Sequence, residues 1–225
     1  MTEKETMEMM INQFMLGQKA EKIKNYKFRN QYARKGETLF VGSSLMENFP
    51  INELQQNLQS THVIYNRGIG GYVTTELMEN MEICIFELEP SKIFINIGTN
   101  DIGCPEYSKE KLIENYDKIL TEIKKRLPQC KVYVMAYYPV NTKANFQGVD
   151  QTRKEEMFRT RTNEAILEAN EAVEALAEKH SYKFINVNEG LFDQDASLKE
   201  EYAIEGLHMW PNGYAVILEN MKKYL

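Results

Sequence analysis

The sequence predicts an α/β fold in which a five-stranded parallel sheet lies between two layers of helices, a three-layer α/β/α sandwich. Five short apolar runs, typical of buried strands, alternate with longer segments whose apolar residues recur at helical spacing. Such alternation builds βαβ units, in which the strands run parallel and helices cover both faces of the sheet. At 225 residues, the chain is long enough for one such domain with a full hydrophobic core.

The predicted strands are short and end in polar, glycine-containing turns or near proline. The third run is almost continuously apolar, as expected for a strand that is covered on both faces. The five runs lie at residues 39–41, 62–66, 92–97, 131–136 and 183–187.

The predicted helices follow the strands. The helix that begins at Ser44 should break or turn early at Pro50, because proline removes a backbone donor and clashes with the preceding turn. The longest segment should be kinked or preceded by a shorter piece. The helical segments lie at residues 44–58, 74–85, 107–127, 152–180 and beyond residue 211.

Residues 1–36 are predicted to form a helical extension packed on the main domain, which spans residues 37–225. Apolar side chains such as Met7, Ile11 and Phe14 recur there at helical spacing. A stripe of this kind could lie on a membrane surface or on a partner, and it could make a homodimer contact. The mixed signs of its charges favour a helix that packs across the domain.

Composition excludes several classes of function. The formal charge of −6 and the absence of a basic stripe argue against a nucleic-acid-binding surface. No basic segment precedes an apolar run at the start of the chain, and no 18-residue apolar segment could span a bilayer. The three cysteines, Cys84, Cys104 and Cys130, lack the pairing of a metal site and suit a reducing cytoplasm. We expect a cytoplasmic protein with no metal and no cofactor.

Three of the predicted strands end in turns rich in glycine and small polar residues. These turns are Gly42-Ser43-Ser44, Gly68-Ile69-Gly70-Gly71 and Gly98-Thr99-Asn100-Asp101. In a parallel sheet all three lie at the same edge, where open α/β sheets hold their ligands. They can therefore converge on one site.

Ser44 is the candidate nucleophile, because the turn places it at a helix start at the carboxyl end of a strand. A serine hydroxyl needs a base to remove its proton. His62 starts a strand and His180 ends a helix among charged residues, so both are interpreted as surface groups. His208 follows the fifth strand and lies three residues after Glu205, whose carboxylate can orient the imidazole and stabilise its charged form.

Acyl transfer also needs donors that bind the developing oxyanion. The Asn100 side chain offers two N–H groups, and Gly71 lets the main chain approach closely. The backbone N–H of Ser44 at the helix start is a third candidate. We interpret Asp101 as structural, bonding backbone at its turn, and we expect Arg67 to support the site through an ion pair.

These blocks together resemble the SGNH hydrolases, the GDSL-type esterase and lipase family. Gly42-Ser43-Ser44 matches the block that carries the nucleophile, and the turns that end in Gly71 and Asp101 match the two oxyanion blocks. Glu205-Gly206-Leu207-His208 matches the last block. The resemblance covers about residues 38–220 and implies a flavodoxin-like sheet of strand order 2-1-3-4-5.

Two positions depart from the family pattern. Ser43 replaces the usual aspartate, which also resembles the platelet-activating-factor acetylhydrolase-like branch and leaves Ser43 as a second candidate nucleophile. Glu205 replaces the aspartate of the triad, so activity could rest on a Ser44–His208 dyad. As substrate-binding residues we add Ser43, Trp210 and Tyr138.

The resemblance implies a serine esterase that acts on small-molecule carboxylic esters through an acyl-enzyme. The absence of a long apolar insertion favours short acyl groups, such as acetyl on a carbohydrate or small alcohol. The alternative is a catalytically weak or inactive binding module for a carbohydrate or an anion. A flavodoxin-like phosphate or flavin binder is a third hypothesis, although it has no need of Asn100 or His208.

Overall fold

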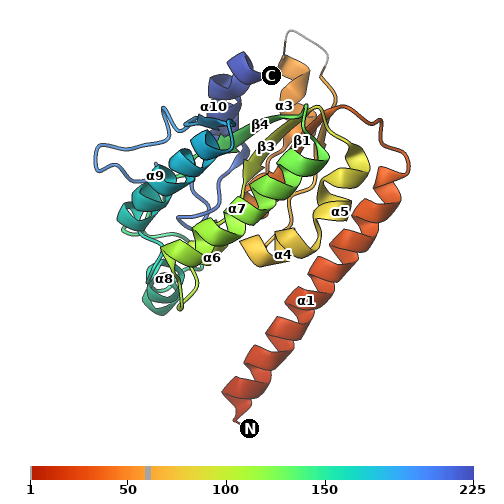
Figure 1. The fold of residues 1–225 in the computed structure, drawn as a ribbon. Coiled ribbons are helices and arrows are strands. Elements are labelled where there is room, and N and C mark those ends of the chain that lie inside the picture. The colour runs from red at the N-terminus through yellow and green to blue at the C-terminus, as the bar shows by residue number, and fades with distance from the viewer. Residues whose placement is uncertain (1, 59–61) are drawn as a thin grey trace.

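One parallel sheet in the strand order β2-β1-β3-β4-β5 organises the computed structural model, which describes residues 2–58 and 62–225 (Figure 1). This confirms the predicted fold class and strand order. Each observed strand lies within its predicted run or extends it by one residue at either end. The strands are β1 (Thr38–Gly42), β2 (Ile64–Asn66), β3 (Lys92–Asn96), β4 (Lys131–Met135) and β5 (Lys183–Ile185).

The helices largely follow the predicted segments, but three of these segments are interrupted. The first breaks at Pro50, as predicted, and the second breaks at Asn80. The third divides where the Thr162 side chain accepts the Ala165 N–H and starts a new helix. The helices are α1 (Glu3–Asn30), α2 (Ser44–Glu47), α3 (Ile51–Leu54), α4 (Thr74–Glu79), α5 (Met81–Cys84), α6 (Thr99–Ile102), α7 (Lys109–Arg126), α8 (Gln151–Phe158), α9 (Asn163–Lys179) and α10 (Pro211–Met221).

Helices cover both faces of the sheet. On one face lie α4, α5, α7 and α9, and on the other lie α10 and the α2–α3 segment (Figure 1). The rings of Phe49 and Tyr214 meet on that second face, with their centroids 4.9 Å apart. Phe40 and Phe94, on adjacent strands, pack edge to face at 5.3 Å. Because the sheet is covered on both sides, its strands are apolar almost throughout.

Helix α1 packs on the domain only through its second half. Tyr26 is buried there, whereas Figure 1 shows the first half projecting away from the domain. The first half of α1 carries a row of exposed apolar side chains: Met7, Met9, Met10, Ile11, Phe14, Met15 and Leu16.

No described helix combines the length and the apolarity needed to cross a membrane.

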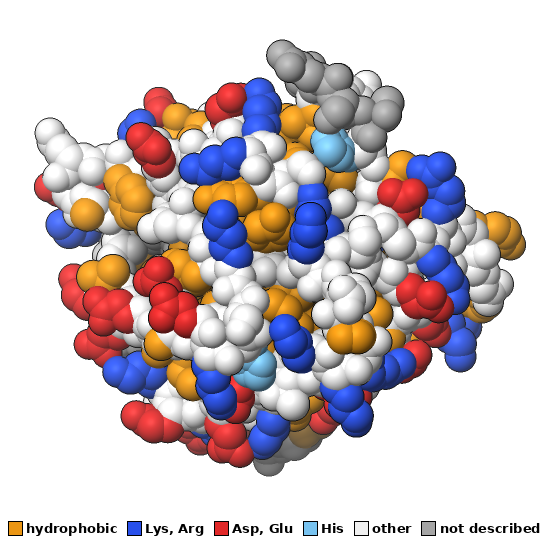
Figure 2. Space-filling model, turned by 45° about the horizontal axis from the view of Figure 1, so that its top comes forward, with side chains coloured by type: hydrophobic (Ala, Val, Ile, Leu, Met, Phe, Trp, Pro, Cys, Tyr) orange, Lys and Arg blue, Asp and Glu red, His pale blue; other side chains and the backbone are white. Residues whose placement is uncertain are grey.

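The two ends of the sheet differ in character. At the amino ends of the strands, Lys92, Lys131 and Lys183 begin β3, β4 and β5. Figure 2 looks onto this end of the molecule and shows basic side chains gathered over apolar ones. The polar turns predicted from the sequence lie at the opposite, carboxyl end.

Gly42 at the end of β1 is needed for the close approach of β1 and β3. Its φ is +156°, and a Cβ atom there would lie 1.9 Å from the Asn96 carbonyl oxygen. Gly42→Ala should therefore lower the free energy of unfolding by about 2–4 kcal/mol, through backbone strain and overpacking. Urea denaturation measures the loss. The control is Gly36→Ala, since Gly36 has φ +81° but open space around it, and should lose about 1 kcal/mol. Equal losses in the two variants would contradict the steric explanation.

Candidate active site

The three polar turns adjoin at the carboxyl end of the sheet. Gly42 pairs with Asn96 across β1 and β3, and the Gly42 carbonyl accepts the Ile69 N–H at 3.0 Å. The turns that follow β1, β2 and β3 are therefore neighbours. β1 lies where the strand order reverses, which is the position at which open α/β sheets form a ligand crevice.

Ser44 meets His208 at this edge. The Ser44 hydroxyl lies 2.7 Å from His208 Nε2, although the two residues are 164 positions apart in the chain. Ser44 is the first residue of α2, so its N–H is one of the helix-start donors that have no acceptor within the helix. His208 lies in the loop between β5 and α10.

Glu205 completes the row on the other side of the imidazole. Its Oε1 is hydrogen-bonded to His208 Nδ1, within a loop closed by the Ile204 N–H and the His208 carbonyl at 2.8 Å. Gly206, with φ +97°, turns this loop against Asn141, and a Cβ there would lie 2.3 Å from the Asn141 carbonyl oxygen. A glycine between acid and base therefore lets the loop pack tightly enough to hold both.

The Glu205 carboxylate is held in its charged form. Burial raises its pKa, but the hydrogen bond and the charge of His208 outweigh burial, so that the pKa of Glu205 lies below its ordinary value. Its second oxygen, Oε2, is buried and has no hydrogen-bond partner among the described residues. The carboxylate can thus accept from Nδ1 and leave Nε2 free to accept the serine proton.

Asn100 is held in one orientation between two groups. Its Nδ2 donates to the Tyr72 carbonyl at 2.9 Å, and its Oδ1 accepts from Arg161 at 3.4 Å. Arg161 is itself buried and donates to the Thr99 carbonyl at 2.9 Å. Because an amide nitrogen carries two N–H groups, one remains for a ligand beside the Gly71 turn.

Gly71 lies in a turn that touches the nucleophile. A Cβ atom on neighbouring Gly70 would lie 4.0 Å from the Ser44 Cβ, and the Gly70 N–H donates to Glu47 at 2.5 Å. Gly71 adopts φ +71°, and within the described chain its N–H makes no backbone hydrogen bond. This N–H is therefore available to donate to a ligand, and its oxyanion-hole role stays a prediction.

Asp101 supports the site by joining two of its turns. Its carboxylate accepts the Thr74 N–H at 3.0 Å and the Thr74 hydroxyl at 2.5 Å, which caps α4 and ties the second turn to the third. Burial raises the pKa of Asp101, the Thr74 hydrogen bonds opposing it. The structural interpretation of Asp101 is confirmed.

Arg67 differs from its prediction. The sequence suggested an ion pair, but the described residues give this guanidinium none. It donates instead to the Asn30 side-chain oxygen at 2.9 Å, and its charge lies over the rings of Tyr26 and Tyr65. Arg67 thus joins α1 to the end of β2.

The predicted substrate-binding residues are placed unequally. Ser43 and Tyr138 are each 1% exposed, and their hydroxyls lack hydrogen-bond partners among the described groups. Trp210 is 51% exposed at the start of α10. Of the three, Trp210 offers surface to a ligand, and all three roles stay predictions.

The other two histidines lie elsewhere. His180 ends α9, and its Nε2 lies 2.5 Å from Asp117 Oδ1 on α7. His62 precedes β2, at the amino end of the sheet. Among the residues that the structure describes, no three His, Cys, Asp or Glu side chains gather as a metal site would require.

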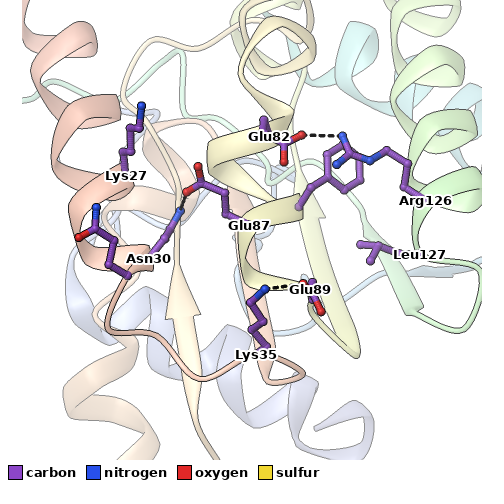
Figure 3. Close-up of a pocket in the computed structure, with 10 residues that line it drawn as sticks. Lys27, Asn30, Lys35, Glu82, Glu87, Glu89, Arg126 and Leu127 are labelled. Atoms are coloured by element: carbon purple, nitrogen blue, oxygen red, sulfur yellow. Dashed lines mark hydrogen bonds and ion pairs between the residues drawn. The ribbon is translucent and has the colours of Figure 1, made fainter.

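A hollow of about 570 Å³ lies away from these turns, beside the ends of α1 and α7 (Figure 3). Two ion pairs lie along it: Glu82 pairs with Arg126 at 2.7 Å, and Lys35 pairs with Glu89 at 2.5 Å. None of the described residues that line the hollow is a serine, a cysteine or a histidine. We therefore assign the candidate active site to the carboxyl edge.

Sequence reasoning missed the residues that support the turns. Glu47, three residues after Ser44, looks like an ordinary solvated acid on a short helix, and Arg161 follows no motif. Lys19 and Lys22 lie in the predicted N-terminal helix, where no motif marks them. The sequence holds one indication of their role: the spacing of these two lysines and Tyr26 places all three on one face of the helix.

Comparison with known proteins gives a consistent result. The model of the GDSL-like Lipase/Acylhydrolase family matches residues 40–216. A solved structure from Streptococcus pneumoniae, described as a platelet activating factor, is 28% identical with a TM-score of 0.86, and the match covers 99% of each chain. Its fold therefore includes a counterpart of nearly the whole chain, α1 among it.

Two curated relatives also match the chain. An N-acylneuraminate cytidylyltransferase of Escherichia coli O18:K1:H7 is 29% identical over 201 residues, which are 85% of this chain but only 41% of that enzyme. This chain thus spans less than half of that relative's length. The platelet-activating factor acetylhydrolase IB subunit alpha2 of Rattus norvegicus is 22% identical over 84% of this chain and 76% of its own.

Proposed function

Because the chain belongs to the GDSL-like lipase/acylhydrolase family and is a hydrolase of that class, we propose that it cleaves short-acyl carboxylic esters through an acyl-enzyme on Ser44. The observation that carries the proposal is the row Ser44, His208 and Glu205, with 2.7 Å between the hydroxyl and Nε2. A nucleophile, its base and a group that orients the base are the elements that acyl transfer requires.

In the acylation step, the Ser44 Oγ attacks the ester carbonyl carbon while His208 Nε2 takes its proton. The carbonyl oxygen becomes an oxyanion, which accepts hydrogen bonds from the N–H groups of Ser44 and Gly71 and from Asn100 Nδ2. Glu205 stabilises the imidazolium that forms. The carbon–oxygen bond to the alcohol then breaks, and His208 returns its proton to the leaving alkoxide.

Deacylation repeats the sequence with water. His208 takes a proton from the water as its oxygen attacks the acyl carbon, and the same donors bind the second oxyanion. Collapse of this intermediate breaks the bond to Ser44 Oγ, which receives the proton from His208. The products are the free acid and the regenerated serine.

The names of the relatives support a short acyl group on a small or sugar-like alcohol. One relative is named as an acetylhydrolase, and another is named for an N-acylated sugar acid. The test is a series of p-nitrophenyl esters with acetyl, butyryl and octanoyl groups. We expect kcat/KM to be highest for acetyl, and a preference for octanoyl would contradict the proposed substrate class.

Loss of the Asn100 amide should slow the chemical step. Asn100→Ala should lower kcat by roughly 10²–10³, because removing one oxyanion donor costs about that much, while KM changes far less. Steady-state kinetics with p-nitrophenyl acetate measures the effect. The control is Asn220→Ala, an amide on α10 that donates to the Val187 carbonyl at 3.0 Å, away from the turns. A loss below threefold in folded Asn100→Ala would reject the oxyanion role.

A further inference from the structure

We infer that α1 is a positioning element for the oxyanion donor peptide, acting through Lys19, Lys22 and Tyr26. The inference deepens the proposed function and rests on it. Helix α1 lies outside residues 40–216, the part that matches the family model. The three side chains are spaced at i, i+3 and i+7, so they share one face of the helix. Each of them contacts the 68–71 turn directly or through one carboxylate.

The donor peptide itself joins Gly70 to Gly71. It carries the Gly71 N–H and lies between two glycines, whose backbones have the widest conformational freedom. A donor placed there is fixed only if the neighbouring peptides are fixed. Both neighbours are held from outside the turn.

Lys19 holds the peptide that follows Gly71. Its Nζ donates to the Gly71 carbonyl at 3.0 Å and to both oxygens of Glu76, at 2.7 and 2.8 Å. Glu76 in turn accepts the Val73 N–H at 3.1 Å. The Lys19 side chain is only 18% exposed, so these charge-assisted bonds are largely shielded from water.

Lys22 acts on the peptide that precedes Gly70. It pairs with Glu47, and the other oxygen of Glu47 accepts the Gly70 N–H at 2.5 Å. Tyr26 adds a third tie, since its hydroxyl donates to the Gly68 carbonyl at 2.6 Å. Burial raises the pKa of Tyr26, which keeps this hydroxyl a neutral donor.

The helix and the sheet therefore position different groups of the site. The sheet places Ser44 and Asn100, whereas α1 fixes the plane of the peptide that carries the Gly71 N–H. An oxyanion donor contributes only when it points at the developing charge. Loosening α1 should therefore affect the transition state more than substrate binding.

The test is Lys19→Met, compared with Lys24→Met on an exposed position of the same helix. We expect Lys19→Met to lower kcat about tenfold with KM changed less than twofold, and Lys19→Arg to recover most of the loss. Lys24→Met should match the parent protein. Equal kcat in Lys19→Met and the parent, or a loss confined to KM, would overturn the inference.

A second readout separates this inference from the proposed function. Amide hydrogen exchange of residues 68–73 needs no substrate, and it should become at least several-fold faster in Lys19→Met but not in Lys24→Met. If the parent protein hydrolyses no ester, the proposed function fails. The exchange data still test whether Lys19, Lys22 and Tyr26 hold the 68–71 turn, an arrangement that we call the clamp. Unchanged exchange in folded Lys19→Met would overturn the clamp whatever the activity.

Discussion

Ser44→Ala should reduce ester hydrolysis to near background, with kcat lower by roughly 10⁴–10⁶. The Ser44 hydroxyl lies 2.7 Å from His208 Nε2 and is the group proposed to form the acyl bond, so the alanine variant retains only binding and oxyanion stabilisation. The KM for p-nitrophenyl acetate should change little, because the side chain is small. Single-turnover kinetics, with and without the substitution, measures the loss.

Two comparison variants sharpen this result. Ser91→Ala, at an exposed position before β3, should retain the parent rate. Ser43→Ala distinguishes the two adjacent serines: if it loses activity to the same extent while Ser44→Ala keeps it, the nucleophile is Ser43. The burial of Ser43, at 1% exposure, argues for Ser44.

Glu205→Gln should lower kcat by roughly 10³–10⁴. Glutamine can donate to Nδ1, which favours the tautomer that carries its proton on Nε2 and cannot accept from Ser44. Steady-state kinetics measures the loss, and Glu201→Gln at a nearby exposed position is the control. A loss below tenfold would mean that Ser44 and His208 work as a dyad.

The same variant should change the acid sensitivity of folding. A carboxyl whose pKa is lower in the folded protein contributes stability at neutral pH, and this contribution is lost as pH falls through the ordinary value of 4.5 and then below it. Urea denaturation at several pH values measures this dependence. The slope of stability against pH in that range should be smaller for Glu205→Gln than for the parent protein.

Much of the fold could be predicted because local and global signals agree. Apolar runs such as residues 92–97 can be read as strands on their own, and the polar turns after them mark the carboxyl edge. Helix breaks were harder to place. Pro50 marks the first break in the sequence, whereas no proline or glycine marks the break at Asn80, where α4 ends and α5 begins.

Some residues of the candidate site could be predicted from the sequence, and others could not. Ser44, His208 and Glu205 lie on recognisable blocks, and the structure brings them into one row. Arg67 was wrongly expected to form an ion pair, since an arginine's partner depends on tertiary contacts across 37 residues. The ties from Lys19 to Gly71 span 52 residues and follow no motif, so sequence reasoning could not find them.

Several expectations remain predictions. The division between residues 1–36 and 37–225 and the cytoplasmic location are among them, as is a homodimer contact through α1. The exposed apolar row on the first half of α1 is consistent with such a homodimer contact. The length of the acyl group and the nature of the alcohol await the ester series.

The central claim is that Ser44 is activated by His208. Labelling with a fluorophosphonate, which reacts with activated serines, tests it most directly when intact mass and peptide mapping identify the modified residue. We predict a single adduct on Ser44 that disappears in His208→Ala. An adduct on Ser43 would move the nucleophile by one residue, and no adduct on the folded protein would contradict the catalytic account and favour a binding module.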